Sequence, residues 1–228
     1  MKIKYYTHST LLLLIERKKI LVDPFFTGNP KLNKKFNILK TINKIDYILV
    51  THAHIDHTKD VEFISKKFNA IIISNYEICA YYKKKQCKTF SFNFGSFINI
   101  NKNIFIKYVY ALHSSSFEDG TYGGNPGGFI IKYNTRIIYI SGDTDLFYNM
   151  KKFKFKFKLL ILPIGGRYTM NIKDALYASK LLNCNYILGV HYNTFPEIVI
   201  NKKKALNLFK KKKKKLFLLN YNKNIIIK

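Results

Sequence analysis

Residues 47–58 read YILVTHAHIDHT, in which an apolar run is followed at once by three histidines and an aspartate. The run at 47–50 predicts a buried β-strand. Val61, Ile64 and Phe68 are spaced three and four residues apart, which predicts a helix that starts near Thr58. The histidine-rich segment is therefore expected in the connection between a strand and a helix.

The polar residues of this segment have the types and spacing of metal ligands. In an extended or turning chain, positions two apart point the same way, so His52 and His54 can bind one cation while Asp56 and His57 turn toward another. Crowded imidazoles repel one another when protonated, whereas a divalent cation satisfies several ring nitrogens and a carboxylate at once. A polar loop that is histidine-rich by chance is the ordinary alternative, and we favour the metal site over it.

Three further candidate ligands follow other apolar runs. They are His113 after residues 104–112, Asp143 after residues 137–140, and His191 after residues 186–190. Each alone has a structural explanation, because a single histidine at a strand end or an aspartate in a Gly-Asp-Thr turn is common. Their recurrence beside the histidine-rich segment favours one shared site.

The order of these residues resembles the five-motif signature of the metallo-β-lactamase superfamily. The matching residues are Asp23, His52, His54, Asp56, His57, His113, Asp143 and His191. Residues 23–25, 123–126, 142–144, 163–166 and 191–195 are also similar to a bacterial group of metal-dependent hydrolases. The resemblance implies an α+β fold, a four-layer αββα sandwich with a dinuclear metal site at one edge, and we expect residues 1–228 to form one domain.

The resemblance also implies how the ligands are divided. His52, His54 and His113 would hold one ion, Asp56, His57 and His191 would hold the other, and Asp143 would bridge the two. Two divalent cations about 3.5 to 4 Å apart can share a water, lower its pKa and polarise the group that it attacks. Asp56 and Asp143 would be the catalytic residues that position this nucleophile. The mixed nitrogen and oxygen ligands suit Zn2+ first, with Mn2+, Fe2+ or Ni2+ as alternatives.

Other polar residues have less certain roles in the sequence alone. Asp23 would orient the histidine loop, since ligand imidazoles need an acceptor on their other nitrogen, although an Asp-Pro turn is the alternative. His8 is either an active-site contact or a structural histidine. Arg167 could pair with a substrate phosphate or carboxylate, or lie on the surface. Asp145 stands where the family has a small residue.

The rest of the chain alternates strand and helix signals. Strands are expected at 2–6, 10–15, 20–22, 70–73, 97–100, 104–112, 128–133, 136–140, 159–162 and 186–190, and helices at 76–85, 171–182 and 202–214. Asn134-Thr135 is a candidate hairpin turn. Two β-rich blocks therefore each close with helices, and the lysine run 210–215 is expected on a solvated helix end.

The formal net charge of +27 could attract nucleic acid or another anion. However, only Arg17, Arg136 and Arg167 are arginines among 40 basic residues, and Lys, Ile, Asn, Tyr and Phe all have AT-rich codons. We favour base composition over a selected binding surface as the cause of the lysine excess. The three cysteines have no C-x-x-C spacing and are expected to be small buried side chains.

The sequence predicts a cytoplasmic enzyme with a small-molecule substrate, because no signal or membrane-spanning segment is found at its start. The favoured reaction is hydrolysis of a small ester, lactone or phosphoester. A nuclease of the same superfamily that acts on RNA or DNA is the alternative, which the charge supports and which the absence of a spare segment for an added domain disfavours. A basic nucleic-acid-binding protein with a structural metal is a third possibility. The sequence leaves the oligomeric state open.

Overall fold

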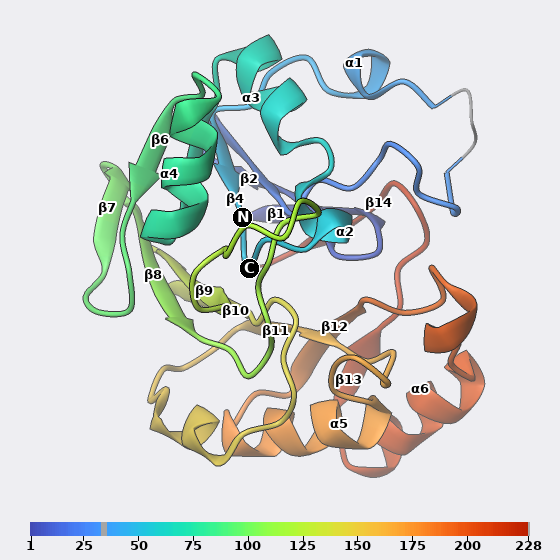
Figure 1. The fold of residues 1–228 in the computed structure, drawn as a ribbon. Coiled ribbons are helices and arrows are strands. Elements are labelled where there is room, and N and C mark those ends of the chain that lie inside the picture. Colours follow the sequence, from blue (N-terminus) through green and yellow to red (C-terminus); the bar gives the residue numbers. More distant parts are fainter. Residues whose placement is uncertain (33–35, 228) are drawn as a thin grey trace.

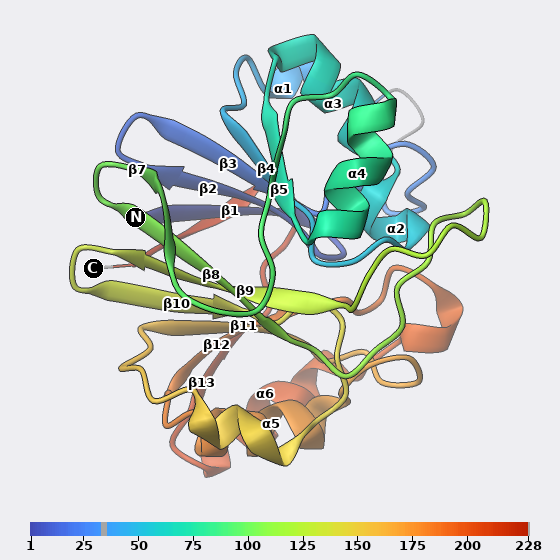
Figure 2. The same ribbon diagram turned by 60° about the vertical axis from the view of Figure 1, so that its left-hand side comes forward.

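Two seven-stranded β-sheets pack face to face, and helices cover the outer face of each sheet (Figures 1 and 2). This computed structural model describes residues 1–32 and 36–227. Helices α1, α3 and α4 lie on one outer side, and α5 and α6 lie on the other (Figure 1). The predicted four-layer αββα arrangement is therefore confirmed.

The first sheet has the strand order β14-β1-β2-β3-β4-β5-β6. Its strands are β1 (Lys2–Thr7), β2 (Thr10–Ile15), β3 (Lys18–Val22), β4 (Tyr47–Leu49), β5 (Ile71–Ser74), β6 (Thr89–Ser91) and β14 (Lys223–Ile226). Strands β1 to β3 form an antiparallel meander, and β3 to β6 are parallel to one another. The helices of this half are α1 (Ile38–Thr41), α2 (Ile55–Thr58), α3 (Val61–Phe68) and α4 (Tyr76–Lys84).

The second sheet repeats this plan, with the order β13-β12-β11-β10-β9-β8-β7. Its strands are β7 (Ile98–Asn101), β8 (Ile104–Tyr110), β9 (Gly127–Tyr133), β10 (Arg136–Ile140), β11 (Leu159–Pro163), β12 (Tyr186–Val190) and β13 (Lys215–Phe217). An antiparallel meander again precedes a set of parallel strands. The helices are α5 (Ile172–Leu181), α6 (Lys202–Lys211) and two 3-10 turns, η1 (Tyr148–Lys152) and η2 (Pro196–Ile198).

The main core lies between the two sheets. Leu13, Ile20, Ile106, Ile138 and Ile161 belong to one buried cluster contributed by both sheets. Separate clusters pack the helices against the outer faces. The central strands are therefore buried on both sides, which explains their continuous apolar runs rather than alternating patterns.

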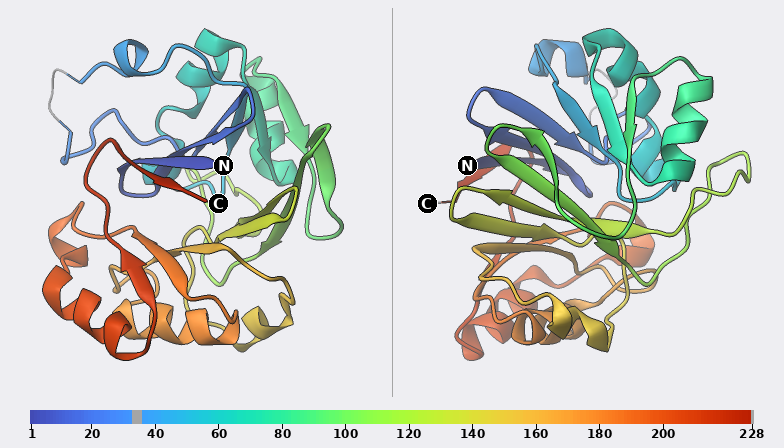
Figure 3. Two further views of the ribbon diagram at one scale, coloured as in Figure 1. Left: turned by 180° about the vertical axis from the view of Figure 1, so that it is seen from behind. Right: turned by 90° about the vertical axis from the view of Figure 1, so that its left-hand side faces the viewer.

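The two ends of the chain lie together at the edge of the first sheet (Figure 3). Strand β14 pairs antiparallel with β1, and Ile227 N donates to Met1 O at 2.9 Å. The last described residues therefore complete the sheet that the first residues begin. Within the described ranges, the structure contains no helix with the length and apolar character needed to cross a bilayer.

Most predicted strands and helices are confirmed, with shifts of one to three residues at many ends. The hairpin turn at Asn134-Thr135 is also confirmed, because β9 and β10 pair directly across it. The helix predicted from Thr58 is wrong at its start: a short helix, α2, already includes Asp56 and His57, and a break at Lys59-Asp60 separates it from α3. The break has a cause, since the Asp60 carboxylate accepts hydrogen bonds from Phe26 N and Thr27 N instead of capping α3.

Six short elements have no counterpart in the sequence prediction: α1, β6, β13, β14 and the two 3-10 turns η1 and η2. The expected solvated helix end at 210–215 is also wrong in its detail, because α6 ends at Lys211 and Lys215 begins β13. Lys214 lies between them and is half-buried. Its Nζ donates to Cys184 O at 2.8 Å, Ser179 O at 3.1 Å and Asn185 Oδ1 at 3.2 Å. One lysine of the run therefore secures the turn between α5 and β12.

We predict that Lys214→Met lowers the free energy of unfolding by about 1 kcal/mol, since it removes an ammonium that satisfies two main-chain carbonyls in a partly solvated place. The melting temperature should fall by about 2–4 °C for a chain of this size. Lys212→Met, at an exposed position of the same run, makes the same change of charge and serves as the control. Equal thermal unfolding curves for the two variants would contradict the assigned role of Lys214.

Candidate metal centre

The candidate site lies where the carboxyl ends of strands from both sheets meet. Strands β1, β3 and β4 run in one direction in the first sheet, and β8, β10 and β12 run in one direction in the second. The polar residues that follow these strands are His8, Asp23, the segment 52–57, His113, Asp143 and His191. The topology therefore delivers side chains from six separate connections to one edge of the sandwich.

One group consists of three imidazoles. His52 Nε2 lies 3.0 Å from His54 Nδ1, which lies 3.3 Å from His113 Nε2. Tetrahedral coordination by imidazoles at 2.0–2.1 Å would place ligand nitrogens about 3.4 Å apart. The three nitrogens thus converge as the ligands of one cation do.

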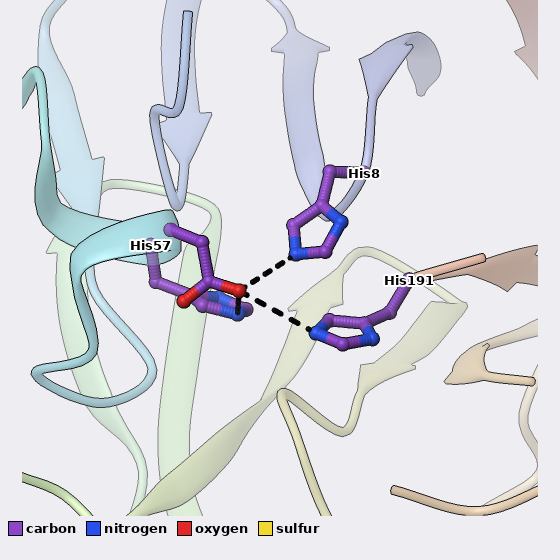
Figure 4. A group of neighbouring side chains, drawn as sticks. His8, His57 and His191 are labelled. Carbon is purple, nitrogen blue, oxygen red and sulfur yellow. Dashed lines mark hydrogen bonds and ion pairs between the residues drawn. The ribbon is translucent and has the colours of Figure 1, made fainter. Parts of the chain in front are cut away.

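A second group contains Asp56, His57 and His191, together with His8. Asp56 Oδ2 lies 3.7 Å from His191 Nε2 and 3.9 Å from His57 Nε2. Figure 4 shows the labelled imidazoles of His8, His57 and His191 directed toward one carboxylate. Asp56 and His57 lie in one connection, and His8 and His191 come from two others, so their convergence depends on the whole fold.

Asp143 lies between the two groups. Its Oδ2 is 2.9 Å from His191 Nε2 and 3.9 Å from His113 Nε2, and its Oδ1 is 3.4 Å from His57 Nε2. The carboxylate is buried, with 3% of the residue exposed. It therefore contacts imidazoles from both groups.

Two facing atoms test whether a cation fits here. Within the described ranges, His57 Nε2 and Asp143 Oδ1 are both buried and have no hydrogen-bond partner. Leaving such atoms unpaired in a protein interior costs free energy. A cation between a neutral imidazole and a carboxylate satisfies both atoms, and the donor set of nitrogen and carboxylate oxygen suits a divalent transition metal. The residues present therefore fit a metal ion.

The pKa values of the histidines in the site shift in opposite directions. Burial opposes the charged form of His191, but the carboxylate of Asp143 outweighs it and raises the pKa of His191 to about 9. Burial also opposes the charged form of His57, but the nearby carboxyl groups of Asp143, Asp56 and Asp23 outweigh it and raise the pKa of His57 well above its usual value. Burial lowers the pKa of His52, and the neighbouring His57 adds to this effect. Protons and metal ions therefore compete for the same inward nitrogens.

Asp23 occupies the orienting position that the sequence predicts for it. Its Oδ1 accepts from Thr51 N at 2.8 Å, and its Oδ2 accepts from Thr51 Oγ1 at 2.7 Å and lies 2.9 Å from His57 Nδ1. Because the carboxylate takes the proton-bearing Nδ1 of His57, the Nε2 of that ring faces the centre. Asp23 thus fixes both the loop and one of the rings.

Strand β8 and the loop after it pack tightly behind the histidine segment. Ser115 Oγ accepts from Ala53 N at 3.1 Å, and Tyr108 Oη donates to Thr51 O at 2.7 Å. A Cβ atom at Gly123 would lie only 2.2 Å from the Cβ of Ala53. The absence of a side chain at Gly123 is therefore what lets the loop that carries His113 approach the histidine segment.

All seven predicted ligands come together in the structure. The residue that sequence reasoning did not assign to the site is His8, which is fully buried. Its Nε2 lies 3.0 Å from Asp56 Oδ2, and burial lowers its pKa to about 4. The sequence feature that could have assigned His8 to the site is its position at the end of the first strand, on the same edge as Asp23.

The two remaining open positions have structural descriptions. Asp145 N donates to Leu112 O at 3.0 Å, and its carboxylate accepts from Leu146 N, so it stabilises the loop beside Asp143. Arg167 is exposed at a positive φ of 59°, and its guanidinium lies 5.5 Å from the ring centre of Tyr168.

The cysteines 79, 87 and 184 are free and buried, as predicted.

Comparison with known proteins gives consistent matches. A family model described as the beta-lactamase superfamily domain matches residues 18–192. A metal-dependent hydrolase from Flavobacterium johnsoniae is 47% identical over 228 residues, which cover 99% of both chains. A metallo hydrolase from the hyperthermophilic archaeon Ignicoccus hospitalis superposes with a TM-score of 0.89 at 30% identity, over 98% of this chain and 97% of that one. An isothiocyanate hydrolase from Delia radicum gut bacteria has a TM-score of 0.79 over 99% of both chains, and at 19% identity this likeness shows the fold alone.

We predict that Asp23→Asn weakens Zn2+ binding by about 10–100-fold, because an amide cannot accept from Thr51 and His57 as the carboxylate does. Competition with a chromophoric chelator measures the affinity. Asp46→Asn is the matched control, since Asp46 accepts from Lys19 N at 2.9 Å and contacts none of the site residues. Unchanged affinity in a folded Asp23→Asn protein would show that Asp23 does not orient the site.

Proposed function

Because this chain belongs to the beta-lactamase superfamily and is a metal-dependent hydrolase, we propose that it hydrolyses a small ester, lactone or phosphoester with two divalent metal ions. Zn2+ is the proposed metal, and Mn2+, Fe2+ or Ni2+ suit the same ligands. His52, His54 and His113 would hold one ion, Asp56, His57 and His191 the other, and Asp143 both.

The position of Asp143 carries the proposal of two ions rather than one. Its carboxylate oxygens contact His191 and His57 on one side, and His113 lies 3.9 Å away on the other. A purely structural zinc site is normally closed by four ligands around one ion. Seven donors in two groups that share a carboxylate are more than one ion needs.

Metal ions bound here would polarise the scissile bond and lower the pKa of a water. The side chains of the chain itself supply order and access. Asp143 is buried and keeps its negative charge, because its pKa is held well below the usual range: burial opposes this, but His191 and His57 outweigh burial. Asp56 has 23% of its side chain exposed and His113 has 13%, so substrate reaches the site past these two residues. Asp56 is thus the carboxylate placed to take a proton from the attacking water and pass it to the leaving group.

The surroundings of this entrance support a small organic substrate. Ile55 and Leu112, the chain neighbours of Asp56 and His113, are exposed by 37% and 44%. Apolar side chains beside a metal centre suit the organic part of an ester or lactone. Arg167 is a proposed contact for an anionic group on the substrate, since its guanidinium is exposed after β11.

We place the activity in the cytoplasm, which the three free and buried cysteines support because such thiols persist in a reducing compartment.

The deciding experiment combines elemental analysis with a substrate screen. Purified protein should contain two equivalents of metal, and a panel of phosphodiesters, lactones and thioesters should be assayed with Zn2+, Mn2+, Fe2+ and Ni2+. The expected result is turnover that a chelator removes and added metal restores. Retention of at most one equivalent, with turnover that is insensitive to chelators, would refute the proposal.

We predict that Asp143→Asn and His54→Ala each reduce kcat/KM by about 10²–10³-fold or more, because they remove charge or a ligand from a centre that contributes several kcal/mol to catalysis. Both variants should keep the circular dichroism spectrum of the parent. Glu118→Gln is the control, since Glu118 is exposed and forms a surface ion pair with Lys59 at 3.6 Å. Full activity of either site variant would remove its residue from the mechanism.

A nuclease is the second candidate, because the net charge is +27 and α6 alone exposes Lys202, Lys203, Lys204, Lys210 and Lys211. A nuclease should cleave a labelled RNA or DNA panel and bind it with a log-linear loss of affinity as salt rises. We expect no metal-dependent cleavage of such a panel. Cleavage that Asp143→Asn abolishes would make the nuclease the better description.

A further inference from the structure

His8 contacts the candidate metal centre but is not one of its seven proposed ligands. It lies in the turn between β1 and β2 with a φ of 56°, and none of its surface is exposed. His191 N donates to His8 O at 3.0 Å, so the turn is tied to the loop after β12. Its ring nitrogens meet two side chains: Nε2 lies 3.0 Å from Asp56 Oδ2, and Nδ1 lies 2.9 Å from Thr194 Oγ1.

The partners of His8 determine where its proton lies. An ionised carboxylate has no proton to give and only accepts hydrogen bonds. The short contact with Asp56 therefore requires a proton on His8 Nε2, whichever role Nδ1 takes toward the hydroxyl of Thr194. A ring nitrogen that carries a proton has no free lone pair, so in this arrangement Nε2 cannot bind a metal ion.

The surroundings of the ring keep this arrangement fixed. The ring centres of Phe25 and Phe195 each lie 5.7 Å from the centre of the His8 ring, in edge-to-face arrangements. The His191 ring lies 4.1 Å away on another side. The residue is fully buried, and among the described residues Asp56 and Thr194 are the side chains that hydrogen-bond its imidazole.

We propose that His8 is a positioning residue, which donates from Nε2 to Asp56 Oδ2 and so holds the Asp56 carboxylate in place for the second metal ion, with Thr194 fixing the ring. The proposal rests on the proposed dinuclear function. It assigns His8 and Thr194 to the same site as Asp56 without making either a ligand. The competing assignment is that His8 is itself a ligand of the second ion.

Substitutions that each replace only one of the two ring nitrogens of His8 test the proposal. His8→Gln can place an amide donor near the position of Nε2, and His8→Asn can place one only near Nδ1, so the pair is matched in chemistry and differs in reach. Asn also tolerates the positive φ of this turn. Thr194→Val removes the hydroxyl partner, and Thr194→Ser keeps it. The full chain is used, loaded with Zn2+ for affinity and with Co2+ for visible absorption, which reports the number and type of metal ligands.

For His8→Asn, we expect the affinity for the second Zn2+ equivalent to fall by about 10–100-fold, the usual effect of losing a hydrogen-bond partner of a ligand. His8→Gln should recover most of this loss, and its Co2+ spectrum should match the parent. Thr194→Val should weaken the second equivalent, whereas Thr194→Ser should not. Circular dichroism establishes that each variant is folded, and if neither His8 variant folds, the Thr194 pair decides.

Several results would overturn the proposal. A Co2+ spectrum that changes in His8→Gln as it does in His8→Asn, with the second equivalent lost in both, would make His8 a ligand. Two tightly bound equivalents in His8→Asn, or unchanged affinity in Thr194→Val, would remove the positioning role. Failure of the parent protein to take up a second equivalent is a separate outcome, which refutes the dinuclear function itself.

Discussion

The structure depends on satisfying carboxyl groups at the buried edge of a sandwich. Asp143 and Asp23 are almost fully buried, and an unpaired carboxylate in such a place costs far more than a small domain can offset. Each instead faces polar partners: Asp23 accepts from the main chain and hydroxyl of Thr51 and contacts His57, and Asp143 faces the imidazoles of His57 and His191. The imidazoles therefore have two tasks: they satisfy the buried carboxyl groups, and they offer nitrogens to a metal ion.

The doubled sheet plan is what makes this gathering of charges possible. Each half begins with an antiparallel meander and continues with parallel strands, so alternate strands of the meander point the same way as the strands that follow. The buried cluster between the sheets holds the two halves face to face. Because both halves present carboxyl ends at one edge, donors more than a hundred residues apart in sequence, such as His57 and His191, share a site.

The sequence predicts most of the local structure because apolar runs mark strands that are buried on both faces. It indicates the site because three histidines and an aspartate occupy one short connection, and the family resemblance extends that site to distant strand ends. The sequence left the role of His8 open, since that role depends on Asp56, 48 residues away. Strands β6, β13 and β14 were missed because they are short edge strands with exposed residues, which only their neighbours specify. The role of Lys214 was also missed, because it donates to main-chain carbonyls of Ser179 and Cys184 and nothing in a run of lysines indicates which one does so.

The hydrogen bonds on the outer side of the ligands show that the centre is arranged by the protein itself. Thr51 Oγ1 gives its proton to Asp23 Oδ2, so it can only accept from His52 Nδ1, 3.0 Å away. His57 Nδ1 likewise donates to Asp23. Both rings therefore carry their proton outward and turn Nε2 toward the centre, before any metal is bound. One carboxylate, Asp23, selects the metal-binding tautomer of two ligands in two different groups. Metal uptake then requires no folding of the loop, because hydrogen bonds at Thr51 and Ala53 already hold the histidine segment in place.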